Sequence, residues 1–219
     1  MVSKTRVGGE KDPKLDLIRS LAPDLVIANI EENRREDVEA LRSWGIPVYV
    51  TYPRTVWEGI QLVRELGAVT GSVQKATELA RELEARYHEV FASMKARQPV
   101  RVFCPIWRRP YMSINRETYV HDMLACAGGA NIFADRSARY PDVTLDEMAA
   151  AKPEVILLPN EPYHFREPHL GDFEKYPSVP AVRDQRIHFV DGKLLSWYGP
   201  RIAEALRTLP ALLSFEHPS

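Results

Sequence analysis

The chain has 219 residues, of which 45% are hydrophobic and 27% charged, and this composition excludes a mainly disordered protein. It provides enough apolar material for one large globular unit or two small lobes. Because 29 Lys and Arg residues are balanced by 30 Asp and Glu residues, the net charge of −1 excludes an overall basic field for nucleic acid or an anionic membrane, so a small molecule or a protein is the expected partner.

Neither membrane-spanning nor targeting segments are evident in the sequence. No run of about 18 apolar residues occurs, and residues 1–6 contain no apolar stretch of the signal-peptide type. An export signal is also removed from a mature protein, so the sequence leaves a cytoplasmic and an extracytoplasmic location open. Cys104 falls in an apolar strand and Cys126 in a helix, which favours two buried free thiols over a disulfide.

Helix-like and strand-like segments alternate in the first part of the chain. A helix over 13–21 leads into a strand over 24–28, whose unbroken apolar character is typical of a strand covered on both faces. A helix over 35–44 follows, with Gly45 as its C-terminal stop and 46–50 as the next strand. This alternation predicts a parallel sheet.

Two more helices come next. The first covers 55–66 and is expected to end at Gly67. The second begins at Ser72 and extends to about residue 97, with apolar residues at three- and four-residue steps. About 25 residues at ~1.5 Å each reach roughly 37 Å, which is enough for a strut between two lobes. An ordinary long helix within one domain is the alternative.

The alternation of helix and strand restarts after Pro99. The predicted elements are a strand over 100–106, helices over 118–126 and 145–151, strands over 155–158 and 186–190, and a closing helix over 200–213. Residues 16–27 and 146–157 also share an order of helix, proline, acidic residue and strand, which favours two related lobes. The sequence therefore predicts an N-terminal lobe over 1–71, a linking helix over 72–98 and a C-terminal lobe over 99–219.

Ligands of open parallel sheets bind beyond the carboxyl ends of the strands, so the loops after the strands are the expected binding regions. These loops are rich in aromatic residues and arginine, which suit a large ligand that is partly flat and partly polar. The candidate contacts are Glu32, Asn33, Tyr52, Arg54, Trp107, Arg108, Arg109, Tyr111, Tyr163, His164, Phe165, Trp197 and Tyr198. The alternative is that Trp107 and Trp197 cap the cores of their own lobes and that 31–37 is a solvated helix start.

Motifs for catalysis and for phosphate loops are absent from the sequence, including GxGxxG, GxxxxGK[ST], GxSxG and HExxH. A binding protein without a resident cofactor or metal is therefore expected. His164 and His169, with Glu161 and Glu167 nearby, are the one group that could gather a metal ion. An enzyme that uses His164 with Glu161 as an acid–base pair remains an alternative.

Several segments together resemble the cobalamin-binding members of the class III, or helical-backbone, periplasmic binding-protein superfamily. The most specific one is Cys126 to Phe133, with the sequence CAGGANIF. The others are Arg6 to Gly9, Asp12 to Asn29, Ser43 to Val48, Arg101 to Phe103 and Gly199 to Ile202. Their order and spacing cover nearly the whole chain.

This resemblance implies two Rossmann-like α/β lobes with parallel sheets, joined by one long helix, with a bound corrinoid such as cobalamin in the cleft between the lobes. It also implies an extracytoplasmic location and docking onto a membrane permease that has a cytoplasmic ATPase. Asn29, Val50, Ser196 and Trp197 differ from the residue types at family contact positions. Haem or a ferric siderophore, with Tyr163 or His164 as an axial ligand, therefore remains an alternative.

A second departure concerns the N-terminus. Family members begin with a strand and a helix that precede the segment Arg6 to Gly9, whereas this chain begins just before it. The N-terminal lobe is therefore expected to lack its first strand and helix, which exposes a sheet edge. A homodimer that covers this edge, or a role in protein interaction in place of transport, is a further alternative.

Overall fold

The computed structural model describes residues 4–214 and has the expected α/β fold class, with parallel strands and one long helix. The chain divides into two compact units, 1–52 and 53–219. The two long helices after residue 55 are part of the second unit. The domain limits at residues 71 and 98 stay a prediction.

The first unit has a small parallel sheet and two short helices. Its elements are β1 (Gly8–Gly9), β2 (Asp12–Pro13), α1 (Leu15–Ser20), β3 (Val26–Asn29), α2 (Arg35–Ser43) and β4 (Val48–Thr51). β3 and β4 pair in parallel, and β1 and β2 form an antiparallel hairpin. The core contains Ile18, Leu41 and Ile46. Gly45 follows α2 with φ +78°, which confirms the predicted glycine stop.

The second unit is built on a four-stranded parallel sheet with the order β10-β9-β5-β7. Its strands are β5 (Val100–Phe103), β7 (Gly129–Asn131), β9 (Val155–Pro159) and β10 (Ile187–Val190). All five residues of β9 are buried, as expected of a central strand covered on both faces. Leu157 packs into one core cluster and Leu158 into another, so each face of the sheet has its own core.

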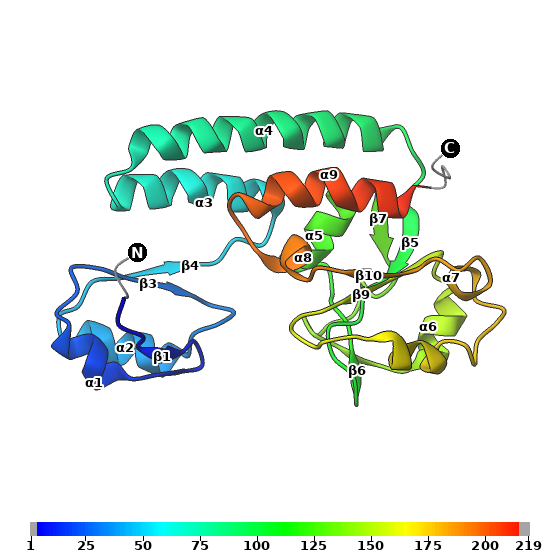
Figure 1. Cartoon of the computed structure of the whole chain (residues 1–219), viewed down its shortest axis with the longest axis horizontal. Helices are drawn as coiled ribbons and strands as arrows, with labels where there is room; N and C mark the ends of the chain where they lie inside the picture. Colours follow the sequence, from blue (N-terminus) through cyan, green and yellow to red (C-terminus); the bar gives the residue numbers. More distant parts are fainter. Residues whose placement is uncertain (1–3, 215–219) are drawn as a thin grey trace. The chain divides into compact units, whose positions relative to one another are not determined.

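Helices cover this sheet. They are α3 (Val56–Val69), α4 (Val73–Lys95), α5 (Tyr119–Cys126), α6 (Leu145–Ala151), the 3₁₀ helix η1 (Glu167–Asp172), α7 (Pro180–Arg183), α8 (Lys193–Ser196) and α9 (Arg201–Leu213). α3 and α4 lie side by side, and α9 packs against α4 (Figure 1). The apolar stripe predicted for the long helix is buried at Ala76, Ala80, Leu83 and Val90.

Several boundaries differ from the sequence prediction, and two of the differences have a structural reason. α3 does not end at Gly67 but continues to Val69, because this glycine lies where α3 and α4 approach each other: a Cβ at Gly67 would be 2.2 Å from the Cβ of Ala76. The strand that begins at Val100 ends at Phe103 instead of Ile106, because the chain then turns into a hairpin.

Cys104 and Cys126 are buried free thiols, as predicted. Burial raises the pKa of the Cys104 thiol to about 12, because the thiolate would lose its hydration. Among the helices that the structure describes between residues 4 and 214, none is long and apolar enough to cross a bilayer.

Candidate functional site

Three of the predicted binding loops follow neighbouring strands of the second unit. The segments 104–110, 160–166 and 191–198 begin where β5, β9 and β10 end, and these strands are adjacent in the order β10-β9-β5. Because all three strands are parallel, their carboxyl ends meet at one edge of the sheet. The topology therefore brings these predicted loops to one region.

Aromatic side chains from the first two loops pack together there. The Trp107 and Tyr163 rings lie 5.6 Å apart between centroids, and Tyr163 and Phe165 lie 4.8 Å apart, both edge to face. Tyr111 stacks on Phe165 at 6.3 Å. Phe165 is buried, whereas 43% of Trp107 is exposed. Trp107 and half-buried Tyr163 therefore form the accessible side of a cluster that is anchored in the core.

A hairpin over 106–112 determines where the side chains of the first loop point. The Ile106 N–H donates to the Met112 carbonyl at 2.9 Å, and the Met112 N–H donates to the Trp107 carbonyl at 3.2 Å. Arg109 at its tip has φ +69° and is exposed. In this hairpin Trp107 is exposed, whereas the Arg108 side chain is only 12% exposed.

The charge of Arg108 is already paired within the protein. Its Nε and Nη2 atoms both lie 2.8 Å from Asp172 Oδ2, and the Tyr111 hydroxyl donates to the same oxygen at 2.8 Å. These hydrogen bonds, the one from Arg108 first, hold the pKa of the Asp172 carboxyl below its usual range. The pKa of Tyr111 is raised, mainly by burial and then by its bond to Asp172. Arg108 and Asp172 therefore hold Tyr111, which stacks on Phe165, in place within the aromatic cluster.

The loops after β9 and β10 are tied to each other. Asn160 Oδ1 accepts a hydrogen bond from the Gly192 N–H at 2.9 Å. A Cβ at Gly192 would be 2.5 Å from the Glu161 carbonyl oxygen, so only glycine allows this approach. The two loops are therefore held at a fixed separation.

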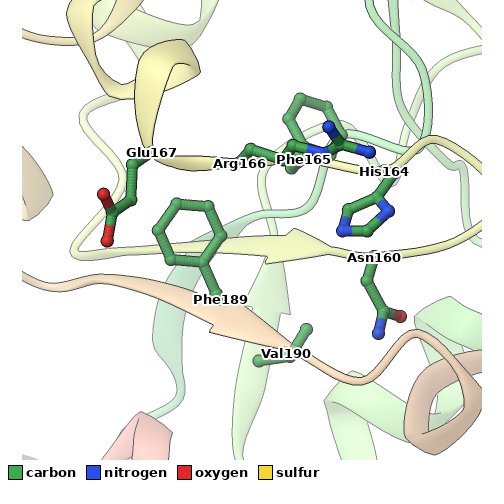
Figure 2. Close-up of a pocket in the computed structure, with 7 residues that line it drawn as sticks. All are labelled: Asn160, His164, Phe165, Arg166, Glu167, Phe189 and Val190. Carbon is green, nitrogen blue, oxygen red and sulfur yellow. The ribbon is translucent and has the colours of Figure 1, made fainter.

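A shallow pocket of about 380 Å³ lies beside this connection (Figure 2). Its lining residues are Asn160, His164, Phe165, Arg166, Glu167, Phe189 and Val190. Phe189 is 44% exposed. The pocket thus has an aromatic floor and a charged rim, and of the predicted residues it contains His164 and Phe165.

The chain around Arg166 is fixed by a histidine. The Arg166 N–H donates to His169 Nδ1 at 3.0 Å, so this nitrogen must be unprotonated. Desolvation lowers the pKa of His169, with a further contribution from the Arg108 charge, which agrees with a neutral ring. His169 also packs against Tyr163 at 5.5 Å and so connects the pocket to the aromatic cluster.

Trp197 and Tyr198, the two predicted contact residues after β10, lie in different environments. Trp197 is 51% exposed, and Lys193 Nζ lies 5.3 Å from the centroid of its ring. Tyr198 is half-buried and packs edge to face on Tyr119 at 4.8 Å. Trp197 therefore presents an accessible surface, whereas Tyr198 packs against the first residue of α5.

In the first unit, Asn33 is engaged within the protein. Its Oδ1 accepts the Asn29 N–H at 2.8 Å and its Nδ2 donates to the Glu10 carbonyl at 3.0 Å, so the amide fixes the loop after β3. Glu32 beside it is exposed, and Tyr52 is half-buried at the end of β4. Arg54 is exposed in the second unit, where its N–H donates to Glu58 Oε2 at 2.6 Å.

Three residues of this region were missed as candidates. Asp172 pairs with a residue 64 positions away, and Phe189 looks like a core residue within the apolar strand Ile187–Val190. Arg166 lies in the predicted binding loop 160–166, directly after the candidates His164 and Phe165, and this position was the signal that could have identified it.

Metal-binding and acid–base geometry are not found at this site. In the part of the chain that the structure describes, no three His, Cys, Asp or Glu side chains gather in a way that could hold a metal ion. Nor is there, within residues 4–214, a hydrogen bond between His164 and Glu161. The Glu161 side chain packs against Gly192, where a Cβ would lie 2.6 Å from Glu161 Cγ.

Comparisons with known proteins agree with this architecture. The family model described as periplasmic binding protein matches residues 1–194. A vitamin B12-binding protein of Vibrio parahaemolyticus is 26% identical over 206 residues, which cover 92% of this chain and 72% of that protein. Matches to further vitamin B12-binding relatives cover between 55% and 65% of their lengths.

Solved structures of two different binding proteins share the fold. The periplasmic vitamin B12-binding protein BtuF of Vibrio cholerae has a TM-score of 0.81 at 21% identity, with 95% of this chain and 80% of that chain covered. The periplasmic haem-binding protein RhuT of Roseiflexus sp. RS-1 has a TM-score of 0.78 at 24% identity, with 93% and 80% covered. At these identities the likeness establishes the fold and leaves the ligand open.

Proposed function

Because the chain belongs to the class III periplasmic binding protein family, we propose that it is the substrate-binding protein of an ABC importer, captures a corrinoid such as cobalamin, and catalyses no reaction. A membrane permease with its ATPase is then the protein partner, and the working location is extracytoplasmic. The observation that supports this most is the accessible aromatic surface of Trp107 and Tyr163, with a further exposed Trp197, in loops at the carboxyl ends of neighbouring parallel strands. Flat rings of this kind suit a large macrocycle.

The vitamin B12-binding relatives support a corrinoid over other large chelates. The missing contact between His164 and Glu161 among the described residues argues against an acid–base pair.

Haem is the second candidate ligand. His164 is exposed, and no hydrogen bond to its imidazole occurs within residues 4–214, so the ring is available as an axial ligand to iron. The haem-binding protein that shares the fold supports the same alternative. A Soret band on addition of haemin, lost in His164→Ala, would identify this mode of binding.

Isothermal titration with cyanocobalamin, haemin and a ferric siderophore tests the proposal. We expect sub-micromolar binding of cyanocobalamin, about −8 kcal/mol or better, which weakens in Trp107→Ala and Trp197→Ala. Phe91→Ala is the matched control, because Phe91 is 49% exposed on α4 and does not belong to the strand-end loops. Failure to bind any of the three chelates would refute the proposal. A stable dimer in gel filtration without ligand would then favour the interaction role.

A further inference from the structure

We propose that the pocket around Phe189 holds the nucleotide arm of a cobalamin-type ligand, that is, a heteroaromatic base joined through ribose to a phosphate. This inference rests on the proposed function and assigns it a ligand class, because a corrinoid without this arm would leave the pocket empty. The pocket has the three features that such an arm requires: a flat apolar floor, a cation and a separate hydrogen-bond acceptor.

The floor is formed by the side chains of the edge strand β10. Phe189 contributes an exposed phenyl ring, and Val190 and buried Phe165 also line the pocket. The phenyl ring is exposed in this shallow pocket, so a flat ring can stack on it. Stacking of a base on an aromatic side chain is independent of the identity of the base.

The charges on the rim lie on opposite sides of this floor. In Figure 2 the Arg166 guanidinium lies on the side of His164, whereas the Glu167 carboxylate lies on the other side of Phe189. Within residues 4–214, neither Arg166 nor Glu167 makes a side-chain ion pair with another residue. A guanidinium is a preferred partner of phosphate, and a carboxylate accepts hydrogen bonds from ribose hydroxyls. The two charges therefore match the two polar parts of a nucleotide.

The rim is also preorganised. The bond between Asn160 and Gly192 joins the two loops, and the bond from the Arg166 N–H to His169 fixes the backbone next to the guanidinium. Buried Phe165 anchors the same loop in the core. A site that needs little ordering on binding loses little affinity to entropy.

The position of the pocket allows one ligand to use both surfaces. Phe165 lines the pocket and contacts Tyr163 at 4.8 Å, and Tyr163 contacts Trp107 at 5.6 Å. The pocket and the accessible aromatic surface are thus joined by the single segment 160–166. A macrocycle on the aromatic surface can place an attached arm in the pocket.

Titration of the full chain with cyanocobalamin and with dicyanocobinamide, the corrinoid that lacks the nucleotide arm, tests this assignment. We expect cyanocobalamin to bind at least about tenfold more tightly. Phe189→Ala and Arg166→Gln should each lower its affinity roughly tenfold and leave dicyanocobinamide within about twofold. The matched controls are Phe91→Ala and Arg207→Gln, which alter an exposed phenyl ring and an exposed guanidinium on α4 and α9.

The possible outcomes separate the inference from the function on which it rests. Equal affinity for the two corrinoids, or equal losses for both in Phe189→Ala, would overturn the assignment of the pocket and keep the corrinoid function. Binding of neither corrinoid by a protein with an unchanged circular dichroism spectrum would overturn both. Loss of the preference for cyanocobalamin in the pocket variants, but not in the control variants, would support the assignment.

Discussion

Replacement of Asp172 by alanine removes the acceptor that Arg108 and Tyr111 share. All three hydrogen bonds end on Asp172 Oδ2 at 2.8 Å, and the Arg108 side chain is 12% exposed. Breaking a fully buried pair by removing one partner costs about 3–5 kcal/mol, and this pair is slightly accessible, so we expect about 2–4 kcal/mol of destabilisation. That cost is a large fraction of the stability of an ordinary domain.

Urea unfolding followed by circular dichroism measures this loss as a lower midpoint with an unchanged slope. Asp184→Ala is the matched control, because Asp184 pairs with Arg183 on an exposed surface, where ion pairs contribute little. In the double variant Arg108→Leu, Asp172→Leu, the destabilisation should be smaller than the sum of the two single changes. A cost for Asp172→Ala as small as that of the control would refute the inference that this network supports the aromatic cluster.

The same network predicts a dependence of stability on pH. The pKa of Asp172 is lower in the folded chain than in the unfolded chain, because Arg108 favours the carboxylate. The carboxylate therefore stabilises the fold above the usual pKa of an aspartate, and this contribution is lost as the pH falls through the lowered folded value. We expect the difference in free energy of unfolding between the wild type and Asp172→Asn to shrink below about pH 4. A difference that persists unchanged into strong acid would contradict this linkage.

Three further predictions concern packing and buried groups. Gly67→Ala should lower the free energy of unfolding in urea by about 1–3 kcal/mol, because the added methyl group would overlap Ala76. In the control Gly9→Ala the methyl group enters open space, so its stability should differ little from that of the wild type. Equal effects of the two changes would contradict the close approach of α3 and α4. Asn131→Ala should cost about 1–3 kcal/mol by the same assay, because its buried amide satisfies two backbone groups at 2.8 and 3.0 Å, and a neutral result would mean that water replaces it. A thiol reagent should label neither cysteine at pH 8 in the folded state, since burial raises the pKa of Cys104 to about 12, and both after unfolding in guanidinium; rapid labelling of the folded protein would contradict the buried core.

Elements with a clear hydrophobic period could be predicted from the sequence. The long helix was expected over 72–97 and spans Val73–Lys95, and the central strand was expected over 155–158 and spans Val155–Pro159. Such elements have a local hydrophobic pattern that indicates their buried residues, and this pattern can be read directly from the sequence. The two-residue strands β6 (Tyr111–Met112) and β8 (Asp142–Val143), which pair with each other, were not foreseen, because a pairing of two residues has no period to detect.

The edge of the sheet at which the candidate loops lie could be predicted for a similar reason. Parallel strands place their carboxyl ends at one edge, whereas the adjacency of the loops after β5, β9 and β10 follows from the strand order, which the structure provides. The role of each side chain within these loops was harder to predict from the sequence. Arg108 and Asn33 were expected to contact a ligand, and in the structure both are engaged by other parts of their own unit.

This difference has a physical origin that bears on the ligand. The composition of a loop shows that polar groups are present, but a partner such as Asp172, 64 positions away from Arg108, decides whether a group is consumed within the fold. A buried charge that has a partner is costly to redirect, whereas Arg166 makes no side-chain ion pair in the described part of the chain and keeps its binding capacity. The residues that can determine ligand choice are therefore those whose polar atoms the fold leaves unused. On this reasoning, exchange of Arg166 should change ligand preference, and exchange of Arg108 should change mainly stability.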